Sequence, residues 1–405
     1  MTQLLALIKW LLILVLLATA AVVVLQHNSD QRKILVVHSY NKDLAWVNDI
    51  NEGISRSLAS ADVRNLNVRT HYMDLKNHPN CNFYQNAAAD VRFTISDWQP
   101  EVVVLVDDLA QALVGFNQLQ TAADFDRSAQ AESIAEWLAS GRCENPGVDY
   151  FGLQREASLT TPTIIFAGVN GTVTQYGYDA ASNVAGIYEH KNYKALIETL
   201  QTLSNASELD VAAIQMLNDH SATGIEENRG YLLQDWSPFN ARAPLAVSSF
   251  EQWQQAVLQA NADNTMLLIA NYQNLTEGDC PEPTANEACK AVSPKEVISW
   301  TERNALLPVL GANTNFVADG GLMTVAISGT EQGQVAMDLA LDALSGTLSP
   351  DYLEAKQFII GMNQSLVRKR QLDLPGIYEA FSREIGQFVD VVETLYMEQA
   401  SAENE

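Results

Sequence analysis

An apolar stretch that ends abruptly in small and polar residues is the feature that most constrains the fold of this chain. Residues 163–171 read Thr-Ile-Ile-Phe-Ala-Gly-Val-Asn-Gly, which predicts a buried strand followed by accessible backbone beside a polar side chain. The same pattern recurs in apolar runs at 33–40, 101–108, 211–217, 266–273 and 307–313, each of which ends at or runs into polar residues. Open α/β sheets bind ligands just outside the carboxyl ends of their parallel strands. The sequence therefore predicts an α/β protein with a small-molecule site built from strand ends.

Length and charge narrow the classes of function. The chain has 405 residues, which is long for one compact α/β core and comfortable for two lobes. With 47% hydrophobic and 18% charged residues, it can bury a sizeable core. Its 49 acidic against 24 basic residues give a net charge of -25, which repels a phosphate backbone. We therefore expect no nucleic-acid partner.

The N-terminal segment predicts export. Residues 10–25 are an unbroken run of apolar or small residues, preceded by Lys9 and followed by polar residues 26–30. Residues 1–28 are interpreted as a signal peptide, cut after the Ala-Thr-Ala at 18–20, or as an uncleaved anchor, because the whole run is about long enough for a hydrocarbon core of roughly 30 Å. Both interpretations predict a periplasmic protein, exported or tethered to the inner membrane.

The four cysteines fit an oxidising compartment, where disulfides persist. Cys280 and Cys289 enclose a polar, proline-containing loop and are predicted to pair, which by elimination leaves Cys81 to pair with Cys143. A zinc site lacks support, because there is no Cys-x-x-Cys and the six histidines are scattered. We expect no metal and no cofactor.

Strands alternate with helices at the spacing of βαβ units, which predicts parallel sheets. Two helical stretches lie between residues 108 and 163, where an ordinary connection needs one, so 121–161 is interpreted as an insertion. The composition then turns to Gly, Thr, Tyr and Asn as far as residue 183, which is typical of a linker between lobes. The predicted division is 30–172 plus 325–348 for lobe 1, and 183–320 plus 349–405 for lobe 2.

Polar residues at the strand ends are the first candidates for ligand contacts. Asp107 and Asp108 could pair with an ammonium group of a ligand, or could cap the helix that follows them. Asn170 and Asn313 lie just beyond apolar strands, one in each predicted lobe. We expect these two asparagines to face each other across a cleft between the lobes.

Aromatic and hydroxyl residues complete the candidate site. Tyr40, Trp46 and Tyr272 could form stacking walls, although each could equally belong to the core. Ser221 and Thr223 precede a helix whose free N–H groups could hold a carboxylate, and the alternative is simple capping. The full predicted ligand-binding set is Ser39, Tyr40, Trp46, Asp107, Asp108, Asn170, Asp219, Ser221, Thr223, Asn271, Tyr272 and Asn313.

The order of these motifs resembles a known family. Residues 168–170 (Gly-Val-Asn), 183–187 (Asn-Val-Ala-Gly-Ile), the helix 192–203, residues 308–311 (Pro-Val-Leu-Gly) and residues 320–323 (Gly-Gly-Leu-Met) carry the resemblance. They resemble the exported substrate-binding proteins of ABC transporters, in the branch with a type I periplasmic-binding-protein fold often assigned to aromatic amino acids. Residues 36–40 (Val-Val-His-Ser-Tyr), followed by Trp46, are also similar to ligand-sensing domains of bacterial sensor kinases.

This resemblance implies two Rossmann-like lobes with parallel sheets, joined by a hinge, that close on a small, amino-acid-like molecule. The implied function is that of an extracytoplasmic solute-binding protein, with an ABC permease as its partner. Two alternatives stay open: a ligand-sensing partner of a membrane signalling protein, and an anchored interaction protein without a small ligand. We expect no enzyme, because the serine-hydrolase, phosphate-loop and zinc-helix motifs are absent from the sequence.

Overall fold

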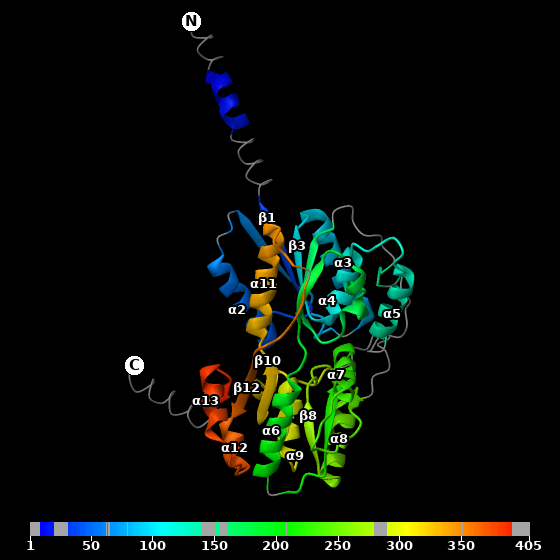
Figure 1. Ribbon diagram of the computed structural model, residues 1–405, viewed down its shortest axis with the longest axis vertical. Coiled ribbons are helices and arrows are strands. Elements are labelled where there is room, and N and C mark those ends of the chain that lie inside the picture. The colour runs from blue at the N-terminus through cyan, green and yellow to red at the C-terminus, as the bar shows by residue number, and fades with distance from the viewer. Residues whose placement is uncertain are drawn as a thin grey trace, which may run out of the picture.

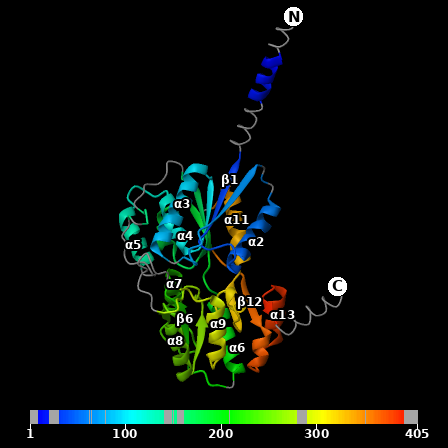
Figure 2. The same ribbon diagram turned by 180° about the vertical axis from the view of Figure 1, so that it is seen from behind.

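The computed structural model describes residues 9–19, 31–61, 63, 65–78, 80–139, 149, 151–153, 161–207, 209–278, 290–349 and 351–390. Two α/β lobes lie one above the other along the long axis of the molecule (Figure 1), and the view from behind shows the same two lobes (Figure 2). Each lobe is a mostly parallel sheet covered by helices on both faces.

Lobe 1 contains a six-stranded sheet in the order β11-β5-β4-β3-β1-β2, in which every pair is parallel. Apolar residues on both faces of its strands are buried, as in the Val-Val-Val-Leu-Val run of β3, because helices cover both sides. Helices α2 and α11 cover one face, and α3, α4 and α5 cover the other. The elements are β1 (Arg32–His38), α2 (Ala45–Ser60), β2 (Leu66–Tyr72), α3 (Cys81–Trp98), β3 (Val102–Val106), α4 (Asp108–Leu113), η1 (Gly115–Gln118), α5 (Arg127–Ala139), β4 (Thr163–Val169), η2 (Val173–Tyr176), η3 (Tyr178–Ala180), β5 (Val184–Tyr188), α11 (Gly329–Ser345) and β11 (Tyr352–Glu354).

Lobe 2 contains a seven-stranded sheet in the order β13-β12-β10-β9-β8-β6-β7, in which β10 and β12 are antiparallel and the other pairs are parallel. Helices α8 and α9 pack on one face, while α6 and the C-terminal helices pack on the other. The elements are α6 (Tyr193–Ala206), β6 (Ala213–Asp219), α7 (Ala222–Leu232), β7 (Leu245–Val247), α8 (Phe250–Ala262), β8 (Thr265–Ile269), α9 (Pro294–Asn304), β9 (Leu310–Gly311), α10 (Asn315–Ala318), β10 (Met323–Ile327), β12 (Phe358–Asn363), α12 (Gln364–Lys369), α13 (Gly376–Glu384) and β13 (Phe388–Val389).

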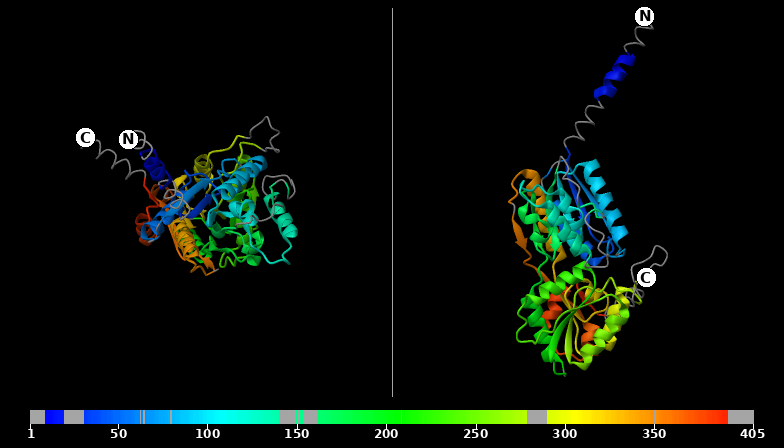
Figure 3. Two further views of the ribbon diagram at one scale, coloured as in Figure 1. Left: turned by 90° about the horizontal axis from the view of Figure 1, so that it is seen from above. Right: turned by 90° about the vertical axis from the view of Figure 1, so that its right-hand side faces the viewer.

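The chain crosses between the lobes three times: between β5 and α6, between β10 and α11, and between β11 and β12. The side view in Figure 3 shows the narrow region that these segments form between the lobes. The N–H of Ser328 in the second crossing donates to the carbonyl of Gln357 in the third at 3.1 Å. The imidazole Nδ1 of His190 in the first crossing lies 2.9 Å from the carboxylate of Glu354, beside the third. The three crossing segments are therefore hydrogen-bonded to one another, and together they form the hinge between the lobes.

The lobe boundaries differ from those predicted from the sequence. Residues 184–188, predicted to open lobe 2, form β5 and pair with β4 in lobe 1, and residues 352–354 also join the sheet of lobe 1. Residues 325–327 were assigned to lobe 1 but belong to β10 of lobe 2. The cause is that short apolar strands on either side of a crossing look alike in sequence, so the pattern does not tell which sheet each one joins.

The predicted insertion is partly described. Helix α5 lies within 121–161, and its Ile134 and Trp137 pack into the core of lobe 1. Most of the remaining insertion lies outside the described residues.

The described residues include only part of the predicted N-terminal segment and one of the four cysteines. Residues 9–19 are helical, and among the described residues no helix is long and apolar enough to cross a membrane. The rest of the predicted signal peptide or anchor lies outside them. Cys81, the first residue of α3, is disulfide-bonded. Cys143, Cys280 and Cys289 lie outside the described residues, so the predicted pairing stays a prediction.

Candidate ligand-binding site

A cavity lies between the two lobes, where loops after the strands of both sheets meet. It holds about 390 Å³ of empty space, including its opening to solvent. Lobe 1 and the first crossing contribute Tyr40, Leu44, Trp46, Lys76, Asp107, Asn170 and Glu189. Lobe 2 contributes Thr223, Glu227, Asn271, Asn313, Thr314 and Asn315. This position agrees with the expectation that ligands bind beyond the carboxyl ends of parallel strands.

Asp107 has the most unusual conformation in the cavity. It follows β3 directly and has φ 70° and ψ 158°, a region that residues other than glycine rarely adopt. Its Oδ1 accepts a 2.9 Å hydrogen bond from Nε1 of Trp46, whereas its buried Oδ2 has no hydrogen-bond partner. Burial and the neighbouring carboxylate of Glu189 raise the pKa of Asp107 well above its usual range. A buried carboxylate oxygen that is held in place but left unpaired indicates a missing donor.

Lobe 2 adds two more unpaired polar atoms to the same cavity. The Nδ2 of Asn271 and the Oδ1 of Asn315 have no hydrogen-bond partner, although these residues are only 1% and 7% exposed. An unpaired buried polar atom costs about 1–3 kcal/mol of stability. Together with Asp107, the cavity thus presents two unpaired acceptors and one unpaired donor, which a polar ligand could satisfy.

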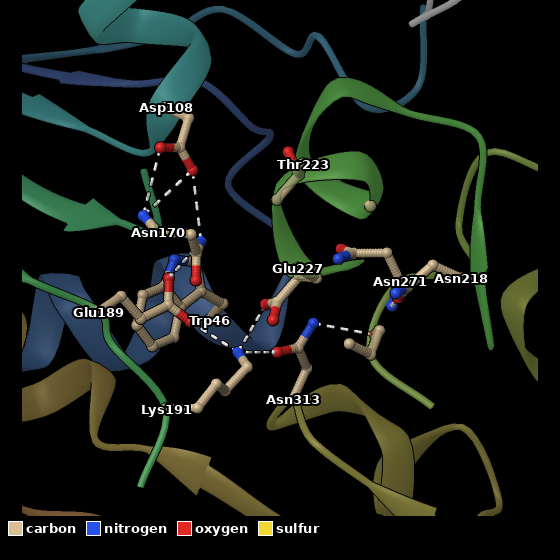
Figure 4. A network of polar contacts seen from close by, with 12 residues as sticks. Trp46, Asp108, Asn170, Glu189, Lys191, Asn218, Thr223, Glu227, Asn271 and Asn313 are labelled. Atoms are coloured by element: carbon tan, nitrogen blue, oxygen red, sulfur yellow. Dashed lines mark hydrogen bonds and ion pairs between the residues drawn. The ribbon is translucent and has the colours of Figure 1, made fainter. Parts of the chain in front are cut away.

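A buried ion network closes one side of the cavity (Figure 4). The Nζ of Lys191 lies 2.8 Å from a carboxylate oxygen of Glu227 and 3.6 Å from one of Glu189, and it donates to Oδ1 of Asn313 at 2.7 Å. Burial lowers the pKa of Lys191, but the two glutamates outweigh it and raise that pKa overall. The network joins the first crossing to α7 and to the loop after β9.

Glu189 in this network has a raised pKa. Burial raises its pKa to about 7, against the opposing effect of Lys191, with a further increase from the carboxylates of Glu227 and Asp108. Glu189 therefore changes charge close to neutral pH.

The lobes touch each other across the cavity. The hydroxyl of Tyr40 in lobe 1 lies 3.3 Å from Oγ1 of Thr223, the second residue of α7 in lobe 2. The ammonium group of Lys76 lies over the ring of Tyr40, 4.4 Å from its centroid. Burial raises the pKa of Tyr40 well above its usual range, so the hydroxyl stays protonated. The two lobes are therefore in direct contact beside the cavity.

Seven residues of the predicted ligand-binding set line the cavity, and they come from both lobes. They are Tyr40, Trp46, Asp107, Asn170, Thr223, Asn271 and Asn313. Asn170 and Asn313 occupy the two sides that the sequence predicts for them (Figure 4).

Two other predicted residues support lobe 1 from behind the cavity. Asp108 accepts hydrogen bonds from the N–H groups of Asn170 and Gly171, at 3.2 and 3.1 Å, and thereby fixes the loop after β4. Ser39 donates to the carbonyl of Val106 at 2.8 Å and accepts from the N–H of Ala110 at 3.0 Å. Both side chains are fully buried and already paired, so neither lines the cavity.

The remaining three predicted residues support lobe 2. Ser221 caps α7, since its hydroxyl accepts from the N–H of Gly224 at 3.1 Å. Asp219 accepts from the N–H of Asn274 at 2.9 Å. Tyr272 is buried in the core and donates to Asp319 at 2.7 Å. The capping alternative thus describes Ser221, and the core alternative describes Tyr272.

Six cavity residues were missed by sequence reasoning: Leu44, Lys76, Glu189, Glu227, Thr314 and Asn315. Glu189 follows β5 directly, so the strand-end rule would have found it if 184–188 had been assigned to the sheet of lobe 1. Glu227 lies inside α7, away from any strand end, and its sequence context gives no signal.

The comparisons with known proteins rest on structure alone, because no protein-family model and no curated protein matches the sequence. A conserved domain protein from Vibrio cholerae has 13% sequence identity and a TM-score of 0.55, over 87% of this chain and 99% of its own. An ABC domain from Streptococcus pneumoniae, in complex with L-Trp, has 14% identity and a TM-score of 0.56, over 89% and 100%. A ligand-free, open substrate-binding protein with adhesive properties from Clostridium difficile has 13% identity and a TM-score of 0.55, over 89% and 99%.

The chain has the type I periplasmic-binding-protein fold. Two α/β lobes, three crossings and a cavity at the strand ends are the features of this fold that the chain displays. At these identities the similarity establishes the fold, and the ligand has to be argued from the cavity itself.

Proposed function

We propose that this protein is an extracytoplasmic solute-binding protein that closes its two lobes on a small molecule bearing a protonated amine. The observation that carries the proposal is the unpaired, buried Oδ2 of Asp107 in the cavity between the lobes. A ligand ammonium group would supply the missing donor, and a charge-assisted hydrogen bond of this kind contributes about 1.5–3 kcal/mol.

The other unpaired atoms support an amino-acid-like ligand. The Oδ1 of Asn315 is a second acceptor for an amine, and the Nδ2 of Asn271 is a donor for a carboxylate or carbonyl oxygen. Lys76 also lines the cavity and could contact the same oxygen. The sequence predicts a ligand carboxylate at the start of α7, but the Ser221 hydroxyl already accepts the hydrogen bond from the N–H of Gly224 there. Asn271 and Lys76 are therefore the proposed contacts instead.

We further propose that the closed form is recognised by an ABC permease. The substrate-binding and L-Trp-bound structures among the similar proteins support this role, which also agrees with the export predicted from residues 1–28. Closure around a ligand requires no bond to be made or broken, so the proposed role is not enzymatic.

A thermal-shift screen against amino acids, amines, nucleosides, sugars and short peptides tests the proposal. A ligand selective for the folded state, present at about one hundred times its Kd, stabilises that state by about 2.7 kcal/mol, which gives a clear rise in Tm. We expect amine-bearing compounds to raise the Tm. A screen in which no compound of any class does so would contradict ligand binding.

An uptake assay separates transport from sensing. Deletion of the gene in its host should abolish uptake of the labelled ligand at low concentration if the protein serves a permease. Normal uptake together with a lost transcriptional response to the ligand would favour a sensor partner.

A further inference from the structure

Carboxylates outnumber ammonium groups around the cavity. Asp107, Glu189 and Glu227 line it, whereas Lys76 is the lysine that lines it and Lys191 lies directly behind. Asp108 and Asp219 form the wall behind these residues and are buried as well. Among these described residues there are five carboxylates against two ammonium groups, an excess of three formal negative charges around the cavity.

Carboxylates of the protein offset the charge of both lysines. Lys191 is held by Glu227, Glu189 and Asn313. Burial lowers the pKa of Lys76, and the carboxylates of Asp219, Asp107 and Glu189 act in the opposite direction. Lys191 therefore has no free positive charge for a ligand, and the charge of Lys76, which can still contact a ligand carboxylate, is offset by these nearby carboxylates.

The unpaired atoms of the cavity also favour a ligand rich in donors, and this argument does not depend on the charges. Asp107 and Asn315 come from opposite lobes, are more than nine-tenths buried, and each present an acceptor without a donor in the cavity. A ligand that satisfies both must carry more than one N–H donor, and an ammonium or guanidinium group supplies several.

We propose that the cavity selects ligands with a net positive charge, such as basic amino acids or diamines, over neutral zwitterions of the same size. This inference rests on the proposed function and adds the charge class of the ligand. Its physical basis is that an uncompensated buried negative charge is costly, and a bound cation removes that cost. In the empty cavity, protons on the carboxyl groups neutralise part of this charge instead. The raised pKa of Asp107, and that of Glu189 at about 7, agree with this.

Matched ligand pairs test the inference on the purified full chain. L-lysine and L-norleucine share a carbon skeleton and differ in the terminal ammonium group, and L-ornithine and L-norvaline form a second such pair. Cadaverine supplies the diamine without the carboxylate. Calorimetric titration should give at least about tenfold tighter binding, or about 1.4 kcal/mol, for the cationic member of a pair.

The possible outcomes separate this inference from the proposed function. If neutral zwitterions bind as tightly as their cationic counterparts, or more tightly, the charge inference is wrong and the solute-binding role stands. If no compound of either charge class binds, and the broad screen described above is also negative, the proposed function itself fails.

A variant pair ties the selectivity to the cavity. Glu189→Gln removes one carboxylate and should reduce the preference for L-lysine over L-norleucine by at least about threefold, because a buried charge contributes strongly to a nearby cation. Glu198→Gln, on the exposed surface of α6, should leave the preference unchanged. An unchanged preference in folded Glu189→Gln protein would overturn the inference.

Discussion

Trp46 donates a 2.9 Å hydrogen bond from its indole Nε1 to Oδ1 of Asp107 and so fixes the carboxylate at the end of β3. The other carboxylate oxygen is left without a partner in the cavity. The backbone of Asp107, at φ 70° and ψ 158°, stores roughly 1–3 kcal/mol of strain. The site is therefore organised before the ligand arrives, at the expense of the stability of the empty protein.

Relief of this strain should separate two variants that both remove the Asp107 side chain and its bond to Trp46. Glycine adopts the backbone conformation of Asp107 freely and alanine does not, so Asp107→Gly should unfold with a free energy about 1 kcal/mol higher than that of Asp107→Ala. Urea unfolding measures the change. Asp90→Gly, at an exposed site inside α3, is the control and should lower stability by only about 0.3 kcal/mol, because Asp is already a poor helix former. An Asp107→Gly protein no more stable than Asp107→Ala would show that the strain argument is wrong.

The ion network around Lys191 should be essential for stability. Lys191→Met leaves Glu227 buried without its cation, and removal of one partner of a buried pair costs about 3–5 kcal/mol. The matched control is Lys194→Met, three residues along the chain, whose exposed pair with Glu198 contributes about 1 kcal/mol or less. Chemical denaturation compares the two variants, and equal effects would contradict the network's role.

The contact between Tyr40 and Thr223 should favour the closed form. Tyr40→Phe removes the 3.3 Å interlobe hydrogen bond, which contributes about 0.5–1.5 kcal/mol, and should shift the population towards open molecules. Small-angle scattering would then detect a larger radius of gyration. Tyr231→Phe removes a bond of the same length inside lobe 2 and should leave the radius unchanged. Identical radii for Tyr40→Phe and the wild type would refute the prediction.

The pH dependence follows from Glu189. Its folded pKa of about 7 lies above its ordinary 4.5, so the stability linked to its proton is fully present below pH 4.5 and is lost as the pH rises through about 7. A cationic ligand favours the ionised carboxylate, so its affinity should increase from about pH 6 to about pH 8, with release of a proton. Calorimetry in two buffers of different ionisation enthalpy measures that release. Glu189→Gln should flatten the profile, and a profile as steep as that of the wild type would assign the titration to another group.

The sequence predicted the fold better than the site. Apolar runs such as that of β3, ending in polar residues, are a local signal that carries over directly to parallel strands and to Asp107, Asn170 and Asn313. The lobe to which β5 belongs depends on long-range pairing and left no local trace. Glu227 lines the cavity only because the folded chain places helix α7 against the cavity. The Nδ2 of Asn271 is unpaired because no acceptor lies beside it in the folded chain, and the sequence gives no sign of this.

Calorimetric titration of the wild type, Asp107→Asn and the exposed control Asp90→Asn with the best amine ligand from the screen tests the central claim most directly. Asp107→Asn removes the charge and keeps the shape, so affinity should fall at least about tenfold, which corresponds to the 1.5–3 kcal/mol of a charge-assisted hydrogen bond. Asp90→Asn should bind as the wild type does. Unchanged affinity in folded Asp107→Asn protein would contradict the claim that Asp107 receives the ligand's amine between the lobes.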